Sequence, residues 1–266
     1  ILAHDGNYRS YIDYVAPQLK ARGLPGVVWS SVAYIGGDRT SAAELLDLHD
    51  NYGWEILSHM YSATFSPSTT QAEVEAEVLK AKKTLHSMGF TRGGDIASWI
   101  GNVGYYNGSP ADLNTVLSSA GYTAARAYTY RESVYGTAKV PANTVQLAWI
   151  TNDLWNLTMD AWNSNGNDAA ALAIRLAKIQ QVIDTRGFQP SYTHHVIDNP
   201  SKNDVSPEFM QAILDAIFAA VDAGTAEVIT YSEWLARTHR RQGYWRFDSG
   251  GKLVHQNDDG TWTAGY

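Results

Sequence analysis

The stretch ILAHDGNYRSYIDYVAPQLKARGLPGVVWSSV, residues 1–32, holds a strand pattern, a helix pattern and a second strand pattern in succession. Ile1–Ala3 is a short apolar run of strand type, and Tyr8 to Ala21 has the apolar spacing of a helix that Gly23 and Pro25 bring to an end. The residues Val27–Val32 are mostly β-branched or aromatic, which favours a strand. Two strands joined by a helix pair in parallel through a right-handed crossover, so the stretch predicts an α/β fold.

The same alternation continues along the chain. Further strands are predicted at Trp54–Ser58, Ala124–Tyr128, Val145–Ile150, Phe188–His194 and Glu227–Tyr231. The helices between them are predicted to begin at capping or first-turn residues, which are Ser41, Thr70, Pro110, Asp168, Ser206 and, for a short last helix, Ser232. The pattern predicts a distorted (β/α) barrel of about seven parallel strands.

The alternation stops near the end of the chain. From about residue 242 the sequence has two turn signals, Ser249-Gly-Gly and Asp258-Asp-Gly, between short runs of strand type. We therefore expect a barrel over residues 1–241. Residues 242–266 are expected to form a short C-terminal β extension or the start of a neighbouring module.

Composition narrows the classes of function. The 266 residues carry 20 basic and 27 acidic side chains, a net charge of −7, whereas a nucleic-acid-binding protein would show a basic excess. The chain has no cysteine, which excludes disulfides, thiolate zinc sites and a cysteine nucleophile. No apolar run approaches the roughly 18 residues of a membrane span, so no membrane partner is expected. Nine Trp and sixteen Tyr against six Phe suit a surface that binds carbohydrate.

Histidines follow three of the predicted strands. His4 and Asp5 follow Ile1–Ala3, His59 follows the strand that ends at Ser58, and His194 and His195 follow the strand near residue 193. Chemistry in parallel α/β folds collects at the carboxyl ends of strands. An Asp with two or three His from separate strands is a plausible site for zinc.

The order and surroundings of these segments resemble the polysaccharide deacetylases of the NodB-homology type, a group of carbohydrate esterases. The resemblance covers roughly residues 1–237. It is carried by the motifs His4-Asp-Gly-Asn-Tyr, Gly53-Trp-Glu-Ile-Leu-Ser-His59, Ile96-Ala-Ser-Trp-Ile, Tyr192-Thr-His194-His-Val and Val228-Ile-Thr-Tyr-Ser-Glu-Trp.

The resemblance implies a metal-dependent hydrolase that removes acetyl groups from a polysaccharide. By position Asp5 and His59 match two metal ligands, zinc being the expected metal with nickel and cobalt as alternatives. His194 matches the residue that protonates the leaving group, and Asp153 matches the acidic fourth motif. An extracellular or cell-surface setting follows from a polymer substrate, as one module of a larger secreted or viral tail protein.

The chain departs from the family pattern at three places. Ala63 stands where a second ligand His is expected, His4 replaces the Asp that acts as base, and no arginine lies near Ala97–Trp99. One alternative moves His4 into coordination with Asp5 and His59, and leaves the acid–base work to His194 or Asp153. In a second, another residue such as Thr64, Asp198 or a further histidine completes the ligand set and His4 is the base. In a third, the metal is absent and the cleft binds glycan without turnover.

Aromatic residues after the middle strands are candidates for stacking on sugar rings. The predicted substrate-binding residues are Tyr105, Trp155, Trp99 and His195. A glycoside hydrolase is a further alternative, because paired carboxylates on an α/β barrel can cleave glycosidic bonds. Its candidate carboxylates are Glu55, Asp95, Asp153 and Asp160, none of which forms a recognisable pair in the sequence.

Overall fold

The computed structural model describes residues 1–62, 68–98, 110–126, 160–161, 166–201, 204–242, 245–247, 253–256 and 262–264. The helices are α1 (Arg9–Lys20), η1 (Val32–Tyr34), α2 (Ala42–Tyr52), α3 (Gln71–Ser87), α4 (Pro110–Ser119), α6 (Ala169–Thr185), α7 (Pro207–Asp222) and α8 (Tyr231–Gln242). The strands are β1 (Leu2–Asp5), β2 (Val27–Ser30), β3 (Glu55–Ser58), β4 (Ile96–Ser98), β5 (Ala124–Arg126), β6 (Asp160–Ala161), β7 (Ser191–Thr193), β8 (Trp245–Phe247), β9 (Leu253–Gln256) and β10 (Trp262–Ala264).

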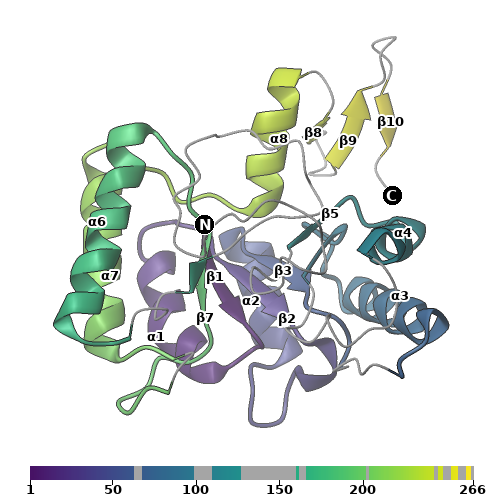
Figure 1. Ribbon diagram of the computed structural model, residues 1–266, viewed down its shortest axis with the longest axis horizontal. Coiled ribbons are helices and arrows are strands. Elements are labelled where there is room, and N and C mark those ends of the chain that lie inside the picture. Colours follow the sequence, from purple (N-terminus) through teal and green to yellow (C-terminus); the bar gives the residue numbers. More distant parts are fainter. Residues whose placement is uncertain are drawn as a thin grey trace.

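Seven of these strands form one sheet in the order β5-β4-β3-β2-β1-β7-β6, and every pairing in it is parallel. Helices α6 and α7 lie at one end of the sheet and α3 and α4 at the other, with α1 and α2 between them (Figure 1). The predicted α/β fold of about seven parallel strands is confirmed.

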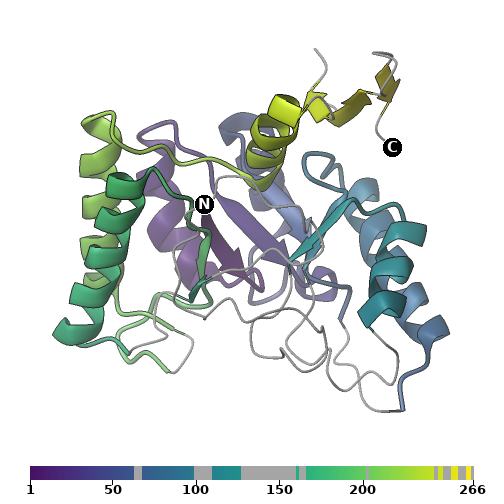
Figure 2. The ribbon, with the colours of Figure 1, turned by 45° about the horizontal axis from the view of Figure 1, so that its top comes forward.

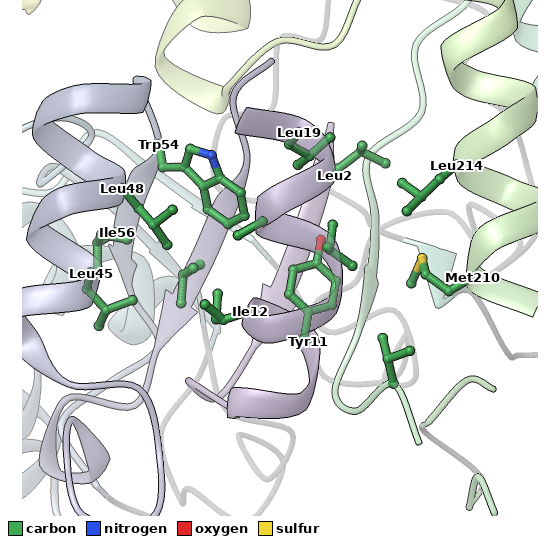
Figure 3. Packing of buried hydrophobic residues seen from close by; sticks show 14 of the residues in the cluster. Leu2, Tyr11, Ile12, Leu19, Leu45, Leu48, Trp54, Ile56, Met210 and Leu214 are labelled. Atoms are coloured by element: carbon green, nitrogen blue, oxygen red, sulfur yellow. The ribbon is translucent and has the colours of Figure 1, made fainter. Parts of the chain in front are cut away.

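The core lies between the sheet and the helices that follow its strands. Figure 3 shows α1 at the centre of the largest cluster, with Tyr11 and Leu19 pointing into it. Leu45 of α2 packs on one side of α1 and Met210 of α7 on the other. The apolar residues of α1 lie on one face, and this face contacts the helices on either side. Helix α1 therefore connects the packing of both halves of the sheet.

The predicted helix starts at Ser41, Thr70, Pro110, Asp168 and Ser206 are confirmed, whereas the last helix begins at Tyr231, one residue before the predicted Ser232. Ser41 and Glu44 form a reciprocal capping box at α2, and Thr70 and Glu73 form one at α3. Asp168 caps α6 through the N–H of the third helical residue, as Ser206 caps α7. These side chains satisfy N–H groups that a helix leaves without partners in its first turn, which is why the sequence shows them so clearly.

The strand predicted at Glu227–Tyr231 is wrong. Residues 226–230 belong to no strand, and Tyr231 is the first residue of α8. The burial of Val228 and Ile229 gives the segment its strand-like pattern. Of the other predicted strands, Phe188–His194 shortens to β7, whereas Val145–Ile150 lies outside the described residues.

Glu55 caps the start of α8 together with Thr230, whose Oγ1 accepts the N–H of Glu233 at 3.3 Å. The carboxylate of Glu55, fully buried on β3, accepts the backbone N–H groups of Tyr231 and Ser232 at 3.0 Å each. The acidic side chain thus caps a helix 176 residues later in the chain, where it also meets the positive end of the helix dipole. Glu55 is held by this structural role, which leaves it unsuited to be half of a glycosidase pair.

The end of the chain forms a separate antiparallel sheet in the order β10-β9-β8. It lies beyond the end of α8, away from the parallel strands (Figures 1 and 2). The predicted C-terminal β extension is confirmed as a structure, whereas the domain boundary near residue 241 stays a prediction. None of the helices in the described ranges is both long enough and apolar enough to span a bilayer.

Burial makes Glu55 a source of pH-dependent stability. Desolvation raises its pKa from 4.5 to about 7, although the hydrogen bonds from the start of α8 act in the opposite direction. The folded protein therefore binds more protons than the unfolded chain between these two pH values, and stability falls as pH rises through this window. In Glu55→Gln this component, about 1–3 kcal/mol, is lost.

Urea unfolding at pH 5, 6, 7 and 8 checks this prediction. Glu75→Gln is the matched control, since Glu75 is exposed on α3, and it should keep the wild-type pH dependence. An unchanged slope in Glu55→Gln would contradict the role given to the buried carboxyl group.

Candidate active site

Three of the predicted site residues lie at one edge of the sheet. Asp5 is the last residue of β1, His59 follows β3 and His194 follows β7. The strands are parallel, so their carboxyl ends meet at this edge. The charges of His59 and His194 both lower the pKa of Asp5, so the three side chains form one electrostatic cluster.

Asp5 is held by an arginine that the sequence analysis missed. Arg126 Nη1 lies 2.6 Å from Oδ1 of Asp5, and Nη2 lies 2.7 Å from Oδ2. Both side chains are only 4% exposed. Burial alone would raise the pKa of Asp5, but the charge and hydrogen bonds of Arg126 outweigh it and hold this pKa at about 2. Asp5 is therefore a carboxylate at any ordinary pH.

The ion pair between Asp5 and Arg126 requires the sheet to be curled. Arg126 belongs to β5, which β4, β3 and β2 separate from β1. In a flat sheet four strand spacings would put the two strands about 19 Å apart, beyond the combined reach of the two side chains. The sheet curls enough to bring the end of β5 opposite the end of β1, which agrees with the distorted barrel that was predicted.

Arg126 was missed because it lies one strand beyond the place where the family motif put an arginine. The expected position was near Ala97–Trp99, and Arg126 is paired in register with Ser98 on the neighbouring strand. The signal available in the sequence was an arginine at the end of an otherwise apolar predicted strand, Ala124-Ala-Arg126. Only the register of β4 and β5 gives that signal its meaning.

One of the two ring nitrogens of His59 is engaged by the backbone. Its Nδ1 lies 3.3 Å from the carbonyl oxygen of Ser98, which assigns the proton to Nδ1 and leaves the lone pair on Nε2. Desolvation lowers the pKa of His59 to about 4, against the pull of Asp5 and with the help of Arg126. The imidazole is therefore neutral near pH 7.

His4 has both ring nitrogens engaged by the backbone. Nδ1 lies 3.3 Å from the carbonyl oxygen of Thr193, and Nε2 accepts the N–H of Tyr8 at 2.7 Å. The ring is fully buried and stacks on Tyr11 with centroids 4.4 Å apart. Burial lowers the pKa of His4 to about 3. Neither nitrogen has a lone pair to spare, so this arrangement does not support His4 as a metal ligand or as a base.

The donors that the structure describes at this edge do not fit a divalent metal. Both oxygens of Asp5 are bound to a cation, His4 is committed to the backbone, and His59 offers one nitrogen. Among the residues that the structure describes, no three His, Cys, Asp or Glu side chains form a group that could hold a metal ion. The predicted ligand set of Asp5, His59 and His4 is thus not assembled here.

Two histidines after β7 share one aromatic neighbour. The ring of Tyr8 lies 6.1 Å from that of His194 and 3.8 Å from that of His195. His195 Nδ1 is 3.1 Å from Ser10 Oγ, and partial burial lowers the pKa of this histidine. Both rings therefore lie at the carboxyl edge of the sheet, beside Tyr8.

Two other candidate residues have side chains that the structure describes. Asp198 is exposed, and Asp95 accepts a hydrogen bond from Thr123 Oγ1 at 2.6 Å. The side chain of Asp160 is not among those described. Outside the described residues lie Ala63, Thr64, Trp99, Tyr105, Asp153 and Trp155.

The packing of His4 predicts a structural effect. His4→Ala leaves a cavity against Tyr11 and removes the acceptor of the Tyr8 N–H, so the free energy of unfolding should fall by about 2–4 kcal/mol. Urea unfolding measures this loss. His86→Ala, at an exposed position on α3, is the control and should change stability by less than about 0.5 kcal/mol. Equal stability of the two variants would contradict a packing role for His4.

Comparisons of sequence find no match: no family model matches the chain, and no curated protein does. Solved structures do match. The chitin deacetylase from Colletotrichum lindemuthianum is 12% identical, with a TM-score of 0.53 over 88% of this chain and 85% of that one. The Xyl-CE4 domain of a multidomain xylanase from the hindgut metagenome of Trinervitermes trinervoides is 9% identical, with a TM-score of 0.51 over 90% and 89%.

A third structure, described as T48 deacetylase with substrate, is 12% identical and gives a TM-score of 0.50 over 89% of this chain and 90% of that one. Identities this low establish the likeness of the fold. The resemblance seen in the sequence motifs is therefore confirmed at the level of the fold: this chain has the curled α/β fold of the polysaccharide deacetylases.

Proposed function

We propose that this chain hydrolyses acetyl groups on a polysaccharide at the carboxyl edge of its sheet. The observation that carries the proposal is the convergence of Asp5, His59 and His194 on that edge in a fold shared with deacetylases. Hydrolysis of an acetyl group needs a base for water, a proton for the departing sugar and stabilisation of the oxyanion.

His59 supplies the base in this proposal. Its Nδ1–H is held by the carbonyl of Ser98, which leaves the lone pair on Nε2 as the proton acceptor of the proposal. The lowered pKa keeps the ring neutral across the range in which most enzymes work. Water attacks the acetyl carbonyl as His59 takes its proton.

His194 supplies the acid. Its ring is placed by edge contacts with Tyr8 and Tyr192, at 6.1 and 5.9 Å between centroids. It protonates the sugar nitrogen or oxygen as the bond to the acetyl carbon breaks, and acetate leaves. The carboxylate of Asp153, which the sequence places in the fourth motif, belongs to the same proposal as a further proton carrier.

The substrate surface is proposed from the sequence and from the rim. His195 lies beside Tyr8 at the edge. The predicted stacking residues are Trp99, Tyr105 and Trp155. An extracellular setting and neighbouring modules belong to the same proposal, supported by a structural neighbour that is one domain of a multidomain xylanase.

Acetate release tests the proposal. Acetylated xylan and chitin oligosaccharides are incubated with the protein, and acetate is measured enzymatically. His194→Ala should lower the rate by about 10²–10⁴-fold, because the leaving group loses its proton donor. His86→Ala is the matched control and should keep the wild-type rate. Release of reducing ends in place of acetate would indicate a glycoside hydrolase and contradict the proposal.

A second function, binding of glycan without turnover, is favoured by one observation. Both oxygens of Asp5 are held by Arg126, which withdraws this carboxylate from proton transfer and from ligation. Under this alternative the aromatic residues of the rim carry the function alone.

Calorimetry with acetylated oligosaccharides distinguishes the two functions. A binding module should show saturable affinity with no acetate released, and Tyr105→Ala or Trp155→Ala should weaken it by about 1–3 kcal/mol, the worth of one buried aromatic contact. Tyr52→Ala, on the exposed end of α2, is the control. Affinity that survives both substitutions would argue against a stacking surface at these positions.

A further inference from the structure

The carboxylate of Asp5 already has a cationic partner, the guanidinium of Arg126, on both of its oxygens. The two contacts of 2.6 and 2.7 Å are parallel and bidentate, which is the arrangement in which guanidinium binds carboxylate most strongly. Both groups are buried, so water does not screen them. The carboxylate that the fold family would offer to a metal is already neutralised by a side chain.

Arg126 is fixed in this place from two further sides. Its guanidinium carbon lies 5.2 Å from the ring centre of Trp29 and 5.0 Å from that of Tyr192. These rings come from β2 and β7, the two strands that flank β1. Aromatic faces attract a cation, so the rings of Trp29 and Tyr192 help to keep the positive charge of Arg126 beside Asp5.

A divalent metal on Asp5 would meet this charge at close range. A metal bound about 2.1 Å from a carboxylate oxygen would lie within about 5 Å of the arginine nitrogen on the same oxygen. The two cations would repel each other in a buried site where the repulsion is strong. Of the residues predicted as ligands, His59 would then be left without Asp5 and without His4, which is committed to the backbone, and Ala63 has no donor.

We propose that the Arg126 guanidinium occupies the place of the metal cation at Asp5, and that this chain takes up no divalent metal at Asp5 and His59. The proposal rests on the placement of the site at this edge. It does not depend on hydrolysis, because metal content and acetate release are measured separately.

Metal uptake by the wild type is the first test. The protein is incubated with excess zinc or cobalt and desalted. Zinc is then measured by elemental mass spectrometry, and cobalt by its visible absorption. We expect no metal whose retention depends on His59, so wild type and His59→Ala should give the same content. Near-stoichiometric metal that is lost in His59→Ala would overturn the proposal.

Restoring the ligand that the family has four residues after His59 is the sharper test. Ala63→His keeps Arg126, so it should still fail to hold cobalt. In Ala63→His/Arg126→Met the charge is removed at similar side-chain length, and cobalt affinity should rise about tenfold or more. The rise should disappear when His59→Ala is added. Ala63→His/Arg22→Met is the matched control, since Arg22 is exposed and stacks on Phe218 away from the site.

Ala63→His alone gives a result even if the double variant does not fold. Circular dichroism shows whether Ala63→His/Arg126→Met folds, since that variant leaves Asp5 buried without its partner. Should it fail to fold, Ala63→His alone decides: no cobalt supports the proposal, and cobalt bound through His59 overturns it. Equal affinity of the single and double variants would likewise show that Arg126 does not exclude the metal.

Discussion

The ion pair between Asp5 and Arg126 is the constraint on which the site depends. It joins β1 to β5 across a curled sheet, so the same contact sets both the shape of the sheet edge and the charge at its centre. Neither partner can be removed alone without cost, because breaking a buried pair leaves an uncompensated charge and typically costs about 3–5 kcal/mol. The aromatic rings of Trp29 and Tyr192 add a second reason for Arg126 to stay where it is.

The residues at the carboxyl edge of the sheet differ in whether their polar atoms are already engaged by other groups of the protein. His4 and Asp5 are adjacent in sequence, yet both are saturated, one by backbone groups and the other by arginine. In the proposed function, His59 and His194 carry out the proton transfers at this edge. The neutral imidazole of His59, with Nδ1–H held by the carbonyl of Ser98, can accept a proton from water. The aromatic neighbours Tyr8 and Tyr192 position His194 without adding charge of their own.

The sequence predicts those features that short segments determine by themselves. The capping boxes at Ser41 and Thr70 each depend on a residue three positions later, and the structure confirms both. The segment from Glu227 to Tyr231 was misread because its buried apolar residues outweighed the capping signal of Thr230 and Glu233. The other capping group, Glu55, lies on β3 and is not visible from local composition. Arg126 escaped notice for the same reason, since its meaning depends on the curl of the sheet. The convergence of Asp5, His59 and His194 was foreseeable, because parallel strands share their carboxyl edge.

The hydrogen bonds of His4 limit which side chains position 4 can accept. The deacetylase motif that this segment resembles has aspartate there, and the substitution His4→Asp looks like a small change. It would set a carboxylate against the carbonyl oxygen of Thr193, which now faces a ring N–H, and would put a second negative charge beside Asp5 in a fully buried place. The N–H of Tyr8 would have to find a new acceptor as well. An aspartate at position 4 is therefore unfavourable among the present neighbours, and it would need compensating substitutions around it.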